Sequence, residues 1–426
     1  MVFPLRLALN LKGGVHSQAL SLYVHIPFCE SLCYYCACNK VITKHKDRSV
    51  QYLDYLSKEM ALLSKSLHAQ ATPVMQLHLG GGSPTFMDDD QLAQLMGRLR
   101  AHFQLDTLAE CSIEVDPRTV SNHRLERLRH LGFNRLSFGV QDFDLQVQKA
   151  VHRVQSVESV AQLMRIAQGL GFESINLDLI YGLPMQTPDS MRKTFAQVIA
   201  LRPDRIALYA YAHLPQRLKP QRRIDSQMLP SAADKSKMLE LALHMLGQAG
   251  YVYIGMDHFA LPQDGLAVAK MQGRIHRNFQ GYSTLPDCDL IGLGVSSVSK
   301  VGATYSQNVK TLEAYYDHLD QRRLPVERGM SLSRDDLIRR AVIMALMCQG
   351  QLSYESVELA YLIDFPSYFD TELRQLERHQ TDGLIEMNAE GIEVTDAGWY
   401  VVRAVAMVFD RYLQADRNRE RYSRVI

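Results

Sequence analysis

Short apolar runs alternate with longer amphipathic segments between about residues 20 and 260. Six runs rich in aliphatic residues are predicted as strands: residues 21–26, 75–82, 111–116, 134–140, 174–182 and 205–215. Segments between them, such as residues 50–67, carry apolar side chains at helical spacing. Repeated strand-then-helix units predict parallel strands with right-handed crossovers, and so an α/β fold that is either a barrel or an open doubly wound sheet.

The pattern changes after residue 310. Residues 309–319 and 335–348 have helical spacing, the turn-rich residues 322–333 join them, and residues 381–398 are typical of a small β-hairpin. The pattern therefore predicts three parts. They are a short irregular segment over residues 1–20, an α/β domain with its extension over residues 21–310, and a smaller, mainly helical domain over residues 311–426.

Polar and glycine residues follow the six predicted strands. They are residues 29–38, 80–83 and 114–116, Gln141, residues 178–182, and His213. Ligands of parallel α/β folds bind at the carboxyl ends of the strands. Six strand ends therefore converge on one predicted site.

Composition narrows the class of protein. Of 426 residues, 46% are hydrophobic and 22% charged, as in ordinary globular proteins. The net charge of +1 argues against a nucleic acid partner held mainly by phosphate contacts. The sequence has no apolar run of the roughly 20 residues that span a bilayer, and its start lacks the features of a signal peptide. We therefore expect no membrane partner and a cytoplasmic location, where thiols stay reduced.

Four of the seven cysteines crowd into ten residues: Cys29, Cys33, Cys36 and Cys38. Cys29, Cys33 and Cys36 form C-x3-C-x2-C, a spacing at which three thiolates of one loop can bind a [4Fe-4S] cluster and leave one iron open. Two alternatives remain at this point. One is a zinc site with Cys38 or His25 as fourth ligand, and the other is a redox dithiol of Cys33 and Cys36.

The cysteine spacing after the first strand and the GGGSP loop at residues 80–84 after the second resemble the radical S-adenosylmethionine superfamily. Further motifs, in order, resemble the oxygen-independent coproporphyrinogen III oxidase family from about residue 19 to the end. They include SLYVHIPFC, CACNK, LHLGGGSPT, IEVDPR, GFNRLSFGVQDF, NLDLIYGLP, HRNFQGY and the terminal YSRVI. The resemblance implies a partial parallel (β/α)6 barrel with a smaller, mainly helical C-terminal domain.

The same resemblance implies an activity. Family members convert two propionates of coproporphyrinogen III to vinyl groups, giving protoporphyrinogen IX in heme biosynthesis, through a 5'-deoxyadenosyl radical. The implied cofactors are a [4Fe-4S] cluster on Cys29, Cys33 and Cys36, and two molecules of S-adenosylmethionine. We also expect an electron donor of the flavodoxin or ferredoxin type, an unidentified electron acceptor, and a monomer. The rival hypotheses are a heme-trafficking relative on the same scaffold and another radical reaction on a tetrapyrrole.

Site residues follow from the matched motifs. For the cluster-bound S-adenosylmethionine the resemblance implies Tyr23, Gly81, Glu114 and Val298. For the second molecule it implies Tyr35, Gly82, Ser83, Gln141, Arg153, Asp178 and Ala212. His25, Cys38, Phe279 and Gln280 are the expected catalytic helpers. The basic residues of 216–225 are expected either to bind propionates or to form a solvated face.

The start of the chain departs from the family pattern. Family members carry an arm of some tens of residues before the first strand, and residues 1–20 do not resemble it. We expect the barrel chemistry to survive its loss, whereas closure over the substrate and exclusion of water depend on it.

Overall fold

The computed structural model describes residues 19–67, 72–285 and 288–415. Internal contacts divide the chain into unit 1, Met1–Met245 with Cys288–Ser331, and unit 2, Leu246–Asp287 with Leu332–Ile426. This division differs from the expected boundary at residue 311, because residues 246–285 pack within unit 2 and residues 311–331 within unit 1. Most of the expected 1–20 segment and the YSRVI motif lie outside the described residues.

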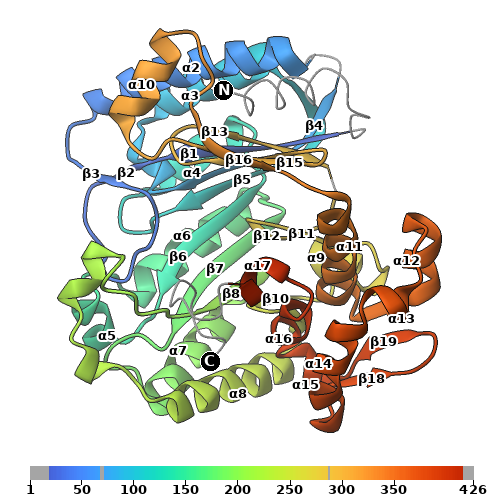
Figure 1. The fold of residues 1–426 in the computed structure, drawn as a ribbon. Helices are drawn as coiled ribbons and strands as arrows, with labels where there is room; N and C mark the ends of the chain where they lie inside the picture. Colours follow the sequence, from blue (N-terminus) through green and yellow to red (C-terminus); the bar gives the residue numbers. More distant parts are fainter. Residues whose placement is uncertain (1–18, 68–71, 286–287, 416–426) are drawn as a thin grey trace. The chain divides into compact units, whose positions relative to one another are not determined.

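Unit 1 is built on the six predicted strands (Figure 1). They are β1 (Leu20–Ile26), β4 (Pro73–Gly81), β5 (Gln104–Val115), β6 (Arg135–Gln141), β7 (Ser174–Tyr181) and β8 (Arg205–Ala210). They pair in this order and all in parallel. The predicted parallel α/β sheet is confirmed, and the carboxyl ends of its six strands lie along one edge.

Helices connect these strands, and most of them begin at a capping side chain. They are α2 (Asp47–Leu67), α3 (Asp89–His102), α4 (Asn122–His130), α5 (Leu145–Ala150), α6 (Val157–Gly169), α7 (Pro188–Leu201) and α8 (Ala232–Gln248). Asp88 forms a capping box with Gln91 at the start of α3, and Thr187 does so with Ser190 at α7. Such caps satisfy backbone N–H groups that have no partner within the helix.

A second group of strands extends the sheet beyond β1. Strand β13 (Asp289–Leu293) pairs with β1 in parallel, and β14 (Val298–Val301), β15 (Thr304–Asn308) and β16 (Val326–Ser331) follow as antiparallel neighbours. Helix α10 (Leu312–Asp320) lies between β15 and β16 in the chain. The prediction that residues 322–333 are only a turn-rich connection is wrong. The mostly exposed VERGMS run shows no alternation, and pairing with β15 makes it a strand.

The cysteine loop begins and ends on a short parallel pair, β2 (Phe28–Cys29) and β3 (Val41–Ile42). The carboxyl end of β1 leads directly into β2. The loop is therefore anchored at the edge of the sheet where the predicted site residues gather.

Unit 2 is mainly helical around a three-stranded sheet of order β17-β19-β18. The strands of unit 2 are β9 (Val252–Gly255), β10 (His258–Ala260), β11 (His276–Asn278), β12 (Gly281–Ser283), β17 (Gln351–Ser353), β18 (Ile385–Met387) and β19 (Gly391–Val394). Its helices are α9 (Gly265–Met271), α11 (Arg334–Gln349), α12 (Tyr354–Tyr361), α13 (Phe365–Tyr368), α14 (Asp370–Thr381), α15 (Asp396–Trp399), α16 (Val402–Met407) and α17 (Arg411–Ala415). Phe365, Phe369 and Phe409 lie in its core. The hairpin predicted within residues 381–398 is confirmed as β18 and β19.

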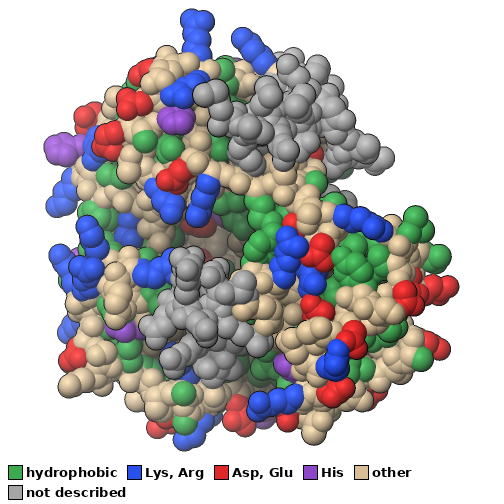
Figure 2. All heavy atoms as spheres, viewed as in Figure 1, with side chains coloured by type: hydrophobic (Ala, Val, Ile, Leu, Met, Phe, Trp, Pro, Cys, Tyr) green, Lys and Arg blue, Asp and Glu red, His purple; other side chains and the backbone are tan. Residues whose placement is uncertain are grey.

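The surface is chemically mixed. On the face that Figure 2 shows, acidic and basic side chains are interspersed, as the net charge of +1 leads one to expect. Among the described residues, no helix is long and apolar enough to cross a membrane.

Candidate active site

The three cysteines of the predicted cluster site lie on one loop after β1. Thr43 N donates to Cys29 O at 2.9 Å, and Cys36 N donates to Cys33 O at 3.3 Å, so backbone bonds hold both the base and the tip of the loop. Cys33 is buried, Cys29 and Cys36 are partly exposed, and all are free thiols. The loop therefore presents three sulfur donors from one short segment.

Local electrostatics favour a thiolate at Cys36. A hydrogen bond from the Cys38 thiol, outweighing burial, and the charge of Lys40 lower the pKa of Cys36 to about 6. Lys40 is held there by the carbonyls of Cys36 and Cys38, at 3.1 and 3.2 Å from Nζ. Burial and the neighbouring Cys36 raise the pKa of Cys29 to about 12. A metal would have to displace the proton from Cys29 but not from Cys36 at neutral pH.

The glycine loop after β4 packs directly on the cysteine loop. Gly82 N donates to Ile26 O at 2.8 Å, and Ser83 N donates to Phe28 O at 2.9 Å. A Cβ at Gly82 would lie 2.8 Å from the Phe28 carbonyl oxygen, so only glycine permits this approach. Gly81 has a φ of 112°, which also requires glycine. Two predicted motifs that lie far apart in the sequence thus form one surface.

A chain of side chains runs across β1, β4 and β5. The Tyr23 hydroxyl lies 3.1 Å from His25 Nδ1, and the Tyr23 ring stacks on His78 at 5.9 Å. His78 Nε2 lies 3.3 Å from Glu114 Oε1, and Gly81 N donates to Glu114 Oε2 at 3.1 Å. Burial would raise the pKa of Glu114, but these contacts outweigh it and lower the pKa. Glu114 is thus held as a carboxylate at the end of β5.

His25 is buried and its two ring nitrogens are engaged. Nε2 lies 2.9 Å from Asn39 O, which only accepts, so Nε2 carries the proton and Nδ1 accepts from Tyr23. Burial lowers the pKa of His25 and favours this neutral form. Asn39 belongs to the same loop as the cysteines, so the histidine links β1 to that loop.

The predicted residues on β6 and β7 lie at the same edge of the sheet. Gln141 has a φ of 73° at a register shift between β6 and β7, which turns its side chain out of the strand alternation. Asp178 accepts from Ser137 Oγ at 3.1 Å and from Asn176 Nδ2 at 2.7 Å. Burial and the charge of Glu114 raise the pKa of Asp178 to about 7. The Asp178 carboxyl group therefore titrates near neutral pH.

Gln221, which the sequence did not single out, holds Tyr35 and Ala212 together. It lies in the 3-10 helix η2 (Lys219–Arg223), and its Nε2 donates to Tyr35 O at 3.0 Å and to Ala212 O at 3.1 Å. The same helix places the Arg223 guanidinium 5.2 Å from the Tyr34 ring centroid. The basic run of residues 216–225 thus adjoins the cysteine loop.

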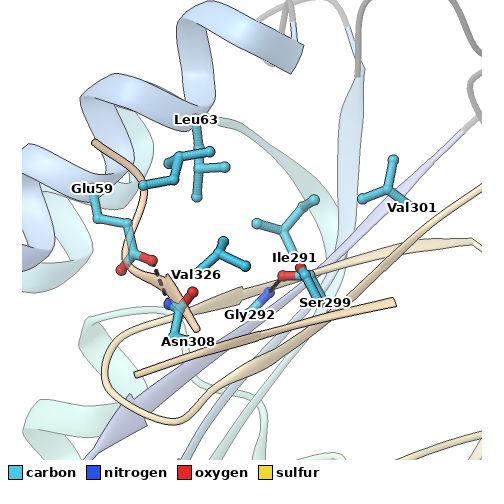
Figure 3. Close-up of a pocket in the computed structure, with 10 residues that line it drawn as sticks. Glu59, Leu63, Ile291, Gly292, Ser299, Val301, Asn308 and Val326 are labelled. Atoms are coloured by element: carbon cyan, nitrogen blue, oxygen red, sulfur yellow. Dashed lines mark hydrogen bonds between the residues drawn. The ribbon is translucent and has the colours of Figure 1, made fainter. Parts of the chain in front are cut away.

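Val298 begins β14 and lies against Gly292 of β13, where a Cβ would be 2.4 Å from Val298 O. The loop before it is held by buried Glu59, which accepts from Gly294 N at 2.7 Å, Asn308 Nδ2 at 2.6 Å and Tyr315 OH at 2.6 Å. Figure 3 shows Glu59 reaching from α2 toward Asn308. The adjoining cavity of about 20 Å³ has room for about one water molecule. The Glu59 network therefore supports the loop that precedes Val298.

Phe279 and Gln280 form the two-residue turn of the β11–β12 hairpin in unit 2. Gln280 N donates to Asn278 Oδ1 at 2.8 Å, and Gly281 has a φ of 132°. The Phe279 side chain is half exposed. In the described part of the chain, buried Gln280 Nε2 and Arg277 Nη1 have no hydrogen-bond partner. The hairpin therefore carries two donors that an acceptor-rich ligand would satisfy.

Comparisons with known proteins agree with this geometry. A model of the radical SAM superfamily matches residues 23–198, and one of the HemN C-terminal domain matches residues 332–401. The oxygen-independent coproporphyrinogen III oxidase of Pseudomonas aeruginosa is 51% identical over 409 residues, 96% of this chain and 88% of the relative. This chain belongs to the oxygen-independent coproporphyrinogen III oxidase family.

Further relatives extend the match. The enzyme of Escherichia coli strain K12 is 46% identical over 409 residues, 96% of this chain and 89% of that relative. The solved structure of coproporphyrinogen III oxidase (HemN) from Escherichia coli, described as a radical SAM enzyme, superposes with a TM-score of 0.92 at 45% identity. It covers 96% of this chain and 93% of that structure. The predicted family and fold class are confirmed.

Family membership assigns the cofactors. The chain uses a [4Fe-4S] cluster with three cysteine ligands, and S-adenosylmethionine. The cysteine loop fits this cluster because it offers three free thiols, one with a lowered pKa. Among the described residues, no three His, Cys, Asp or Glu side chains are grouped to hold a single metal ion. The zinc and redox-dithiol alternatives are replaced by the cluster.

Proposed function

We propose that this chain oxidatively decarboxylates two propionate side chains of coproporphyrinogen III to vinyl groups without oxygen, giving protoporphyrinogen IX in heme biosynthesis. The observation that carries the proposal is 51% identity to an oxygen-independent coproporphyrinogen III oxidase over 96% of the chain. The match includes the cysteine loop. The cluster and S-adenosylmethionine, when bound, supply a 5'-deoxyadenosyl radical.

Residues on β1, β4, β5 and β14 are proposed to hold the cluster-bound S-adenosylmethionine. Gly81 brings backbone close to a charged ligand without a side chain in the way. Glu114 stays ionised and offers acceptor oxygens, which suit ribose hydroxyls. Tyr23 lies on β1, which pairs with β13, and Val298 begins β14. We place both beside the cluster-bound S-adenosylmethionine.

A second S-adenosylmethionine is proposed to bind beside the first. Its residues are Tyr35, Gly82, Ser83, Gln141, Arg153, Asp178 and Ala212. Asp178 and Gln141 supply acceptor and donor groups, and the hydrogen bonds of Gln221 keep Tyr35 near Ala212. Two molecules of S-adenosylmethionine match the two propionate side chains that react.

Four residues are proposed as catalytic helpers. His25 links Tyr23 to the cysteine loop by two hydrogen bonds, and its Nδ1 is placed to exchange a proton with the Tyr23 hydroxyl. Cys38 donates to Cys36 in this structure, and this hydrogen bond raises the pKa of Cys38. Phe279 and Gln280 offer an exposed ring for a planar macrocycle and an unsatisfied amide for a propionate.

The partners beyond the substrate are also proposals. A one-electron donor of the flavodoxin or ferredoxin type reduces the cluster, and a separate acceptor takes the final electron. We propose a monomer in the cytoplasm, where its seven cysteines stay reduced.

An anaerobic assay tests the function. Reconstituted protein with coproporphyrinogen III, S-adenosylmethionine and reductant is expected to give protoporphyrinogen IX together with 5'-deoxyadenosine. Heme binding without product would favour the trafficking relative, and a different tetrapyrrole product would favour another radical reaction. The Cys33→Ser variant is the control that should give neither product.

A further inference from the structure

A tight turn after β5 presents an arginine toward the cysteine loop. Thr119 N donates to Asp116 O at 3.0 Å, which closes a β-turn with Pro117 in its second position, where proline is favoured. Arg118 follows and folds back on Asp116, with Nε 2.9 Å from Oδ1 and Nη2 2.7 Å from Oδ2. This two-pronged contact fixes the plane and direction of the guanidinium.

Arg118 shares its carboxylate and its target with a second arginine. Arg153 Nη1 lies 3.4 Å from Asp116 Oδ2, and Nη2 lies 3.3 Å from Oδ1. Arg153 Nη1 also donates to Cys33 Sγ at 3.4 Å, and Arg118 Nη2 donates to the same sulfur at 3.7 Å. Two guanidinium groups therefore converge on one cysteine of the loop.

The charges of this group do not cancel among themselves. Asp116 provides one negative charge against the two positive charges of Arg118 and Arg153. Arg153 is only 7% exposed, and a buried charge is costly without a counter-charge. The cluster, bound through Cys33, would supply the missing negative charge.

We infer that Arg118 sets the reduction potential of the cluster by donating to Cys33 Sγ and by its positive charge. This inference rests on the cluster-binding part of the proposed function. Reduction adds negative charge to the cluster, and hydrogen bonds to the sulfurs and nearby positive charge favour the reduced form. Arg118 thereby makes the cluster easier to reduce. Neither Arg118 nor Asp116 contacts the substrate in this account, so both act through the cluster.

The test is a redox titration followed by electron paramagnetic resonance. Anaerobically reconstituted full-length protein is titrated without S-adenosylmethionine or substrate, as wild type, Arg118→Gln and Arg118→Lys. Arg118→Gln is expected to shift the reduction equilibrium about tenfold toward the oxidised cluster, which is about 59 mV for one electron. Arg118→Lys keeps the positive charge but loses the two-pronged guanidinium contact, so the reduction potential of its cluster should fall less than that of Arg118→Gln.

The matched control is Arg135→Gln. Arg135, the first residue of β6, pairs with Glu110 of β5 at 2.8 Å, and the pair is 14% and 20% exposed against 19% and 12% for Arg118 and Asp116. Its potential should equal that of the wild type. A wild-type potential in Arg118→Gln at equal iron content would overturn the inference. If Arg118→Gln takes up no cluster, a wild-type potential in Arg118→Lys would overturn it. No substrate is present, so failure of decarboxylation leaves this result unaffected.

Discussion

Two carboxylates in unit 1, fully buried Glu59 and mostly buried Asp116, have opposite surroundings. Glu59 on α2 accepts from three uncharged donors, and burial raises its pKa from 4.5 to about 7. Asp116 after β5 is held by two arginines, which outweigh burial and lower its pKa. Uncharged donors fix the position of Glu59, whereas the arginines at Asp116 leave positive charge beside Cys33. The first arrangement supports a loop, and the second faces a charged cofactor.

The largest effect is expected from replacing Cys33, whose sulfur accepts hydrogen bonds from both Arg118 and Arg153. Cys33→Ser should lose the cluster, because it removes one of three thiolate ligands and leaves the guanidinium groups of Arg118 and Arg153 without a thiolate counter-charge. Iron and sulfide content after anaerobic reconstitution measures this loss. Cys38→Ser is the matched control and should retain the cluster. Full cluster content in Cys33→Ser would contradict the ligand assignment.

The next effect concerns the uncharged network. Glu59→Leu should destabilise unit 1 by about 2 kcal/mol or more, since it leaves the buried donors Gly294 N and Tyr315 OH without an acceptor, at about 1–3 kcal/mol each. Thermal unfolding of the cluster-free protein measures the shift. Tyr315→Phe removes one hydroxyl and should cost about 1 kcal/mol. Equal unfolding midpoints for Glu59→Leu and the wild type would show that the network carries no stability.

A smaller effect is the pH dependence of stability, which should differ between Glu59, whose pKa is raised, and Asp116, whose pKa is lowered. The pKa of Glu59 is raised on folding, so the folded protein binds its proton more tightly than the unfolded chain. This contribution is present below the unfolded pKa of 4.5 and is lost as pH rises through about 7. The titratable groups that contact Glu59 or its loop are the hydroxyls of Tyr315 and Tyr52, and burial raises the pKa of both.

Glu59→Gln should remove this dependence. Relative to that variant, the wild type should lose about 2 kcal/mol of stability between pH 5.5 and pH 8. Unfolding curves at the two pH values measure the difference, and Glu126→Gln, at an exposed position on α4, serves as control. A wild-type advantage that grows with pH would mean that the Glu59 pKa is lowered on folding.

The sequence predicted features that are local or strictly periodic. The three cysteines lie within one loop, and the six strands of the parallel sheet show as apolar runs, so both could be predicted. Strand β16 could not, because its mostly exposed residues are ordered by pairing with β15 rather than by their own pattern.

Long-range polar contacts account for most of what the sequence did not predict. Glu59 and Asn308 are 249 residues apart, and Gln221 and Tyr35 are 186 apart. Arg118 contacts a sulfur 85 residues earlier in the chain. The IEVDPR motif points to Arg118, but nothing in its spacing shows which cysteine it meets. Only the fold brings such partners together.

One measurement tests the proposed chemistry most directly. Coproporphyrinogen III that carries deuterium on the β-carbons of its propionates is turned over anaerobically by the reconstituted protein, and 5'-deoxyadenosine is analysed by mass spectrometry. Deuterium is expected to pass into 5'-deoxyadenosine while vinyl product accumulates. Vinyl product formed with unlabelled 5'-deoxyadenosine, or no vinyl product from protein with a full cluster, would contradict it.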